Sequence, residues 1–109
     1  MSYIQEAEKL LQQAVNAEDL REAVKLLKDS ILILLKGFYK TDNVKEALLK
    51  YLQDIVKSRE YVLALYILIP LFVESFPDVL KDAPEDIVRL YLSNMIVLYE
   101  KSRQILGIM

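Results

Sequence analysis

The sequence predicts an all-α protein, a four- to five-helix antiparallel bundle that forms one domain over residues 1–109. Leu, Ile and Val supply 39 of the 109 residues, whereas Gly and Pro together supply only five. This composition is typical of packed helices and argues against disorder and against a turn-rich β fold. Apolar residues also recur at three- and four-residue steps along most of the chain. A chain of this length buries about 60–70% of its unfolded surface, which suits a single core.

The first helix is expected over about residues 3–15. Ser2 and Gln5 have the spacing of a capping box, in which each side chain accepts a hydrogen bond from the other's backbone N–H. Apolar residues at helical spacing then follow, namely Tyr3, Ile4, Ala7, Leu10, Leu11, Ala14 and Val15.

The second helix is expected over about residues 17–38. Asn16 is a candidate N-cap and Gly37 a candidate C-terminal cap, because these residue types are favoured at those two positions. The apolar run at 31–35 leaves a strand as the competing interpretation. Helix is favoured because the run lies inside a longer helical pattern without the turn residues of a hairpin.

After a turn at residues 40–43, Asp42 or Asn43 can cap a third helix. Its expected core positions are Val44, Leu48, Tyr51, Leu52 and Ile55. Near residues 57–60 the pattern changes from one-sided to apolar all round, which predicts a short break and then a helix over about residues 59–75. Pro70 should bend that helix, because proline donates no backbone hydrogen bond and pushes against the preceding turn.

The segment from Glu74 to Asp86 is rich in acidic residues and contains two prolines, which predicts a loop with one short turn. Asp82 and Glu85 have a second capping-box spacing around Pro84. The last helix is therefore expected over about residues 84–106.

The composition excludes several kinds of chemistry. With no Cys and no His, the chain cannot form a disulfide, a thiolate zinc site or a histidine-dependent catalytic triad. No spacing of carboxylates marks a catalytic pair, so we expect no enzyme activity, no catalytic residue, no metal and no cofactor. The net charge of -2 provides no overall field that would attract nucleic acid or anionic lipid.

Residues 61–73, YVLALYILIPLFV, form the most apolar stretch of the chain. Thirteen helical residues span about 20 Å against about 30 Å of hydrocarbon, and Arg59, Glu60 and Glu74 flank them. A membrane span is therefore not expected. The N-terminus lacks the features of a signal peptide, so a cytoplasmic location is expected. Abundant Leu, Ile, Lys and Glu without Cys are compatible with a thermophile.

A helix that is apolar on every side must be surrounded, and four other helices of a short chain cover it with difficulty. Apolar residues off the main stripe of the second and last helices add to the uncovered surface. We therefore expect a homo-oligomer or a heteromeric protein partner, with a well-filled monomer as the alternative. The candidate interface residues, each of which could equally be core, are Ile33, Leu65, Leu68, Phe72 and Ile96.

The best local basic set on one helix face is Lys25, Lys28 and Lys36. These lysines are candidate weak nucleic-acid contacts. Glu22 and Asp29 lie among them, however, which favours ordinary pairing on a solvated helix face. Nucleic-acid binding is therefore the minority interpretation.

The segment AEKLLQQAVNAEDLREAVKLLKDSILILLKGFY resembles the first helical hairpin of the HEPN superfamily, including its small archaeal members. The run EYVLALYILIP, the acidic loop and APEDIVRLYLSNMIVLYEKSRQIL are similar to the closing helix pair of that family. The first hairpin also resembles tetratricopeptide and microtubule-interacting-and-transport helices, which bind peptide segments.

The HEPN resemblance implies a helical bundle and a role in nucleic-acid metabolism or defence. The family's ribonuclease motif is an arginine followed after four to six residues by a histidine. Arg59 stands in a plausible region, but the chain has no histidine. The resemblance therefore implies a non-catalytic member, and no active-site residue carries over.

Overall fold

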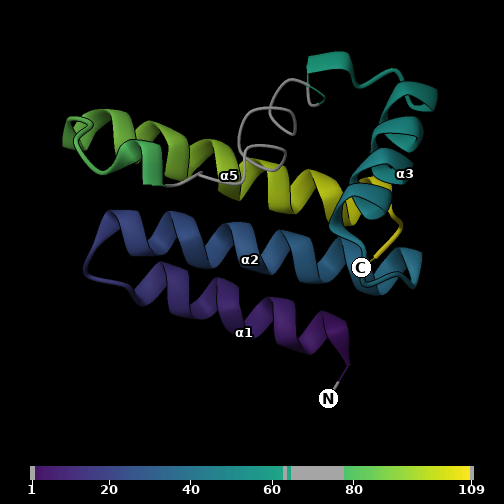
Figure 1. Cartoon of the computed structure of the whole chain (residues 1–109), viewed down its shortest axis with the longest axis horizontal. Helices are drawn as coiled ribbons and strands as arrows, with labels where there is room; N and C mark the ends of the chain where they lie inside the picture. Colours follow the sequence, from purple (N-terminus) through teal and green to yellow (C-terminus); the bar gives the residue numbers. More distant parts are fainter. Residues whose placement is uncertain (1, 63, 65–77, 109) are drawn as a thin grey trace.

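The protein is described from a computed structural model, which places residues 2–62, 64 and 78–108. The described part of the chain is an all-α bundle, as the composition predicts (Figure 1). Its elements, in chain order, are α1 (Tyr3–Asn16), α2 (Leu20–Tyr39), α3 (Val44–Lys57), the 3-10 helix η1 (Asp78–Leu80) and α5 (Glu85–Ile105). Most of the predicted fourth helix, together with Pro70, lies outside the described residues.

Local caps account for the starts of the first three helices. The capping box of Ser2 and Gln5 is present, and Asn43 accepts a hydrogen bond from the N–H of Glu46. The predicted N-cap of α2 is wrong, because Asn16 is the last residue of α1 and the Asp19 side chain caps α2 by accepting from the N–H of Arg21.

Two further predicted caps are also wrong. Gly37 lies inside α2, and Lys40 ends the helix in the left-handed conformation. Pro84 occupies the N-cap position of α5 without a side-chain cap, so the spacing of Asp82 and Glu85 does not form a capping box. The predicted break before the fourth helix is present, since α3 ends at Lys57.

The helices α1 and α2 are antiparallel, but α5 runs in the same direction as α2, and α3 crosses one end of the group (Figure 1). This direction departs from a fully antiparallel bundle. Arg21 ties the start of α2 to the start of α5, since its guanidinium donates hydrogen bonds to the carbonyls of Leu80 (2.9 Å) and Ala83 (2.6 Å). The end of α2 and the start of α5 therefore lie at opposite ends of the bundle (Figure 1).

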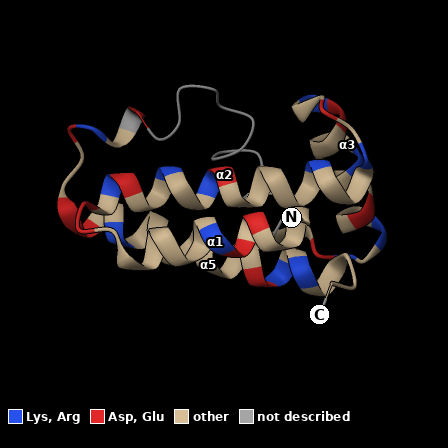
Figure 2. Cartoon of the chain, turned by 90° about the horizontal axis from the view of Figure 1, so that it is seen from below, with Lys and Arg blue, Asp and Glu red and all other residues tan. Residues whose placement is uncertain are grey.

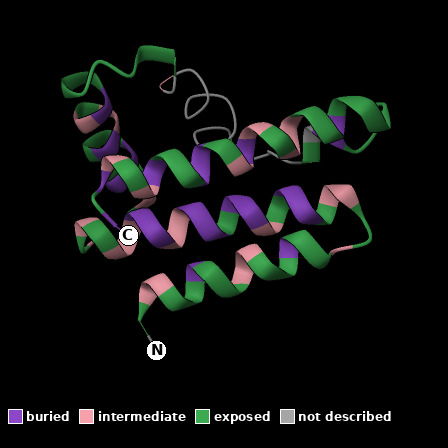
Figure 3. Cartoon of the chain, turned by 180° about the vertical axis from the view of Figure 1, so that it is seen from behind, coloured by how far each residue is buried: buried purple, intermediate pink, exposed green. Residues whose placement is uncertain are grey.

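The core is centred on α2, which carries buried residues along its whole length (Figure 3). One cluster joins α2 to α1, α3 and the C-terminal half of α5, and a smaller cluster around Val24, Leu80 and Val88 closes the other end. Two hydrogen bonds cross this core. Ser30 donates to the carbonyl of Ala7 (2.5 Å), and Tyr51 on α3 bonds Ser102 on α5 (2.5 Å).

Candidate functional site

The predicted interface residues that the structure describes lie at two separate places. Ile33 and Ile96 are each half-buried and pack against the main core cluster. Ile33 borders a pocket near the end of α2, whereas Ile96 borders a pocket between α1, α2 and α5. The other three candidates, Leu65, Leu68 and Phe72, lie outside the described residues.

The three predicted nucleic-acid contacts on α2 differ in exposure. Lys25 is exposed, Lys36 is half-buried, and Lys28 is 9% exposed. Acidic residues are interspersed among the basic residues of this helix (Figure 2). Asp29 lies within the field of these lysines; desolvation raises the pKa of its carboxyl, and Lys25 and Lys28 oppose that rise. The arrangement is an interleaved charged face and not a uniform basic strip that would follow a phosphate backbone.

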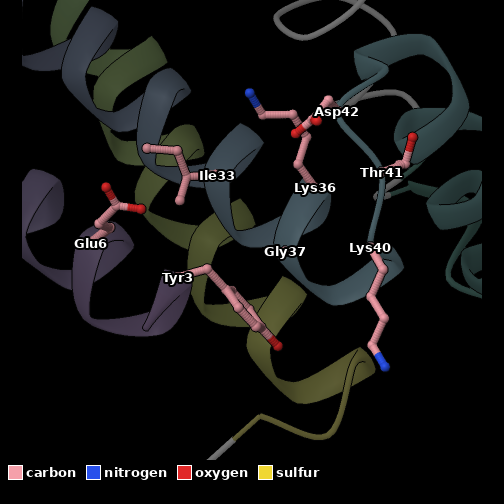
Figure 4. Close-up of a pocket in the computed structure, with 8 residues that line it drawn as sticks. All are labelled: Tyr3, Glu6, Ile33, Lys36, Gly37, Lys40, Thr41 and Asp42. Atoms are coloured by element: carbon pink, nitrogen blue, oxygen red, sulfur yellow. The ribbon is translucent and has the colours of Figure 1, made fainter. Parts of the chain in front are cut away.

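Where α1 begins and α2 ends, the surface holds a pocket of about 320 Å³ (Figure 4). Its floor is made by the aromatic ring of Tyr3, which lies against the backbone of α2 at Gly37. The remaining lining residues are Glu6, Ile33, Lys36, Lys40, Thr41 and Asp42. The sequence patterns of helix caps and basic residues do not group these residues, because they come from two helices and the turn after α2.

The charges of this pocket cancel. Lys36 and Lys40 contribute two ammonium groups, and Glu6 and Asp42 contribute two carboxylates. The hydroxyl of Thr41 is already engaged, since it donates to Glu46 (3.0 Å) and accepts from the N–H of Asn43 (3.1 Å). A ligand carrying a single strong charge therefore gains little here, which weakens the case for Lys36 as a phosphate contact.

The outward side of α5 carries a strip of exposed apolar residues. Leu90 is 57% exposed, Val97 is 46% exposed and Ile87 is 39% exposed. Asn94 and Lys101 continue the same line at steps of three and four residues, which keep side chains on one side of a helix. The buried residues of α5 lie on another side of the helix and pack into the core; they are Val88, Met95, Leu98, Tyr99 and Ser102. We call Ile87, Leu90, Asn94, Val97 and Lys101 the α5 strip.

The sequence pattern anticipated part of this strip, because Leu90 and Val97 stand off the main apolar stripe of the last helix. It did not single out Leu49 and Val56 on α3, which are 54% and 49% exposed. Their seven-residue separation places them on one side of α3, and this spacing could have identified them from the sequence.

Side chains suited to metal binding do not gather in the described ranges. No group of three or more acidic side chains there has the geometry to hold a metal ion. The Tyr39 hydroxyl donates a hydrogen bond to the Asp54 carboxylate (2.5 Å) and links the end of α2 to α3. None of the described helices is both long enough and apolar enough to cross a membrane.

No family model, no curated protein and no solved structure matches the chain.

Proposed function

We propose that the protein is a non-enzymatic assembly module that forms a homodimer through the α5 strip. The observation that carries this proposal is the exposure of Leu90 and Val97, two large aliphatic side chains on the side of α5 that faces away from the core. Large exposed apolar patches mark interaction sites on soluble proteins, and a second copy of the α5 strip would cover these two side chains.

The order of residues in the strip suits a second copy of the same helix. Ile87 lies seven residues before Asn94, and Lys101 lies seven residues after it. Leu90 lies between Ile87 and Asn94, and Val97 lies between Asn94 and Lys101. A two-fold axis near Asn94 would set Leu90 of one copy against Val97 of the other, as the self-complementary surface of a symmetric dimer requires.

Polar residues of the strip fit the same arrangement. Antiparallel pairing would bring Lys101 of one copy toward Asp86 of the other, and both residues are exposed. Asn94 at the axis would meet its own symmetry mate, and a single asparagine within an apolar helix contact specifies register.

The test is the mass of the protein in solution, measured by size-exclusion chromatography with light scattering. We expect the unmodified protein to have twice its 12.7 kDa chain mass at micromolar concentration. Leu90→Lys should shift the mass to that of one chain while the helical circular dichroism spectrum stays the same, because an exposed side chain contributes little to the monomer fold.

Leu49→Lys is the matched control, since Leu49 has nearly the same exposure as Leu90 but lies on α3. This variant should remain dimeric. A concentration-independent mass of 12.7 kDa for the unmodified protein would contradict the proposal. Salt-sensitive RNA or DNA binding by that monomer, weakened when Lys25 and Lys28 are neutralised, would instead favour the HEPN-like accessory role.

A further inference from the structure

A second pocket lies between α1, α2 and α5, on a different side of α5 from the strip. Its volume is about 190 Å³. Only alanine and aliphatic side chains line it, namely Leu11, Ala14, Val15, Ala17, Leu20, Ala23, Leu27, Leu92 and Ile96. The pocket exists because three of these positions are alanines, which leave space where the three helices meet.

The lining is graded from a buried floor to an open rim. Ala14, Ala23 and Leu27 are 4%, 1% and 0% exposed and form the floor. Leu92 and Ile96 of α5 are half-buried walls, and Val15, 65% exposed, stands at the rim. The pocket is therefore open to solvent at Val15 and is bounded on the inside by buried alanine and leucine side chains.

We infer that this pocket binds a small uncharged apolar molecule, of the size of one aromatic ring or a short branched hydrocarbon. Apolar cavities of about 150 Å³ stay dry and accept benzene, and this pocket is slightly larger. No lining side chain carries a charge or a hydrogen-bonding group, so a buried polar ligand would lose its water contacts without replacement. An apolar ligand instead gains the contacts that the alanines leave unfilled.

The experiment is a titration of the full-length protein with toluene, followed by NMR of the methyl groups. We expect saturable shifts at the methyls of Ala14, Ala23, Leu27 and Ile96. The methyls of Leu48 and Ile55, which belong to α3, should not move and provide an internal control.

Two variants fill the pocket. Ala17→Leu places a larger side chain at a half-buried lining position just after α1, where Ala17 packs against the core. Ala14→Leu fills the floor from α1 and serves if the first variant does not fold, as judged by circular dichroism. Each should weaken toluene binding by at least about tenfold.

Gln13→Leu is the matched control, because it adds a leucine to the exposed surface of α1 outside the pocket and should leave the affinity unchanged. Toluene shifts that do not saturate, or an affinity that a folded pocket-filling variant retains, would overturn the inference. The readout does not depend on the dimer, because the α5 strip shares no residue with the pocket lining.

Discussion

Two buried tyrosines show how one hydroxyl can stabilise the fold while another adds nothing to it. The Tyr51 hydroxyl bonds Ser102 Oγ (2.5 Å), and Ser102 in turn donates to the carbonyl of Leu98 (2.6 Å). The Tyr99 hydroxyl is buried beside Ser30 and Arg103, but none of its contacts within the described ranges has the geometry of a hydrogen bond. An unpaired buried hydroxyl has lost its water contacts without replacement.

We therefore expect opposite effects from the same substitution at these two positions. Tyr51→Phe should lower the free energy of unfolding by about 1–2 kcal/mol, because it removes a satisfied buried hydrogen bond. Tyr99→Phe should leave that free energy unchanged or raise it by up to about 1 kcal/mol. Urea denaturation followed by circular dichroism measures both values. Equal destabilisation by the two variants would show that Tyr99 has a partner.

At the scale of helices, the contact of α1 with α2 depends on a glycine inside α2. A Cβ atom at Gly37 would lie 2.1 Å from Cγ of Tyr3 and 2.6 Å from its Cβ. The Cβ atom of Tyr3 is bonded directly to the backbone, so it cannot move away from Gly37 without movement of the start of α1. Gly37 is therefore needed for close approach of two helices, and it is not the helix terminator that its position near the end of the pattern predicts.

Gly37→Ala should destabilise the protein by about 1–3 kcal/mol through overpacking, although alanine favours an isolated helix by about 1 kcal/mol. In a Tyr3→Gly background the clashing atoms are gone, and the same substitution should become stabilising. The four proteins to compare are the unmodified protein, Gly37→Ala, Tyr3→Gly and the double variant. Their free energies of unfolding show whether Gly37→Ala stabilises or destabilises each background. A destabilisation that persists without Tyr3 would assign the role of Gly37 to something other than this contact.

Gly107 provides the contrast. It has a φ of +71° and no atom within 4 Å of an added Cβ. A substitution there meets only the cost of a left-handed backbone and not a neighbouring helix. The two glycines of the chain thus serve different purposes.

At the scale of the whole molecule, three tyrosines should make the stability of the bundle depend on pH in the alkaline range. Burial raises the pKa of Tyr51 to about 12, and it also raises the pKa values of Tyr39 and Tyr99. For Tyr39 the hydrogen bond to Asp54 adds to the rise. All three residues lie at contacts between helices, so their ionisation opposes the packed state.

Since the unfolded chain releases these protons near pH 10 and the folded chain keeps them, stability should be fully present below pH 10 and fall as the pH rises toward 12. Tyr51 alone should account for a loss of roughly 3 kcal/mol across that window. Urea denaturation at successive pH values measures the slope. Tyr51→Phe should flatten it by that amount, and parallel curves for the two proteins would count against the assignment.

Much of the fold was predictable because its determinants are local. The helices α1, α2, α3 and α5 lie within a few residues of the predicted ranges, since apolar spacing and the caps at Ser2 and Asn43 act within one or two turns. The helical state of residues 31–35 was predictable for the same reason. The exposed apolar residues were predictable only in part: Leu90 and Val97 of α5 were recognisable as surplus apolar residues, whereas Leu49 and Val56 of α3 were not.

The sequence by itself determined the fold class, the placement of the described helices and the lack of thiol or imidazole chemistry, because composition and short-range periodicity suffice for these. Tertiary structure alone decided the parallel course of α2 and α5, the guanidinium link from Arg21 to Leu80 and Ala83, and the apolar pocket floored by Ala14 and Ala23. These features join residues far apart in the chain, and their energies depend on how whole helices approach one another. The spacing of residues along one helix does not predict how that helix approaches another.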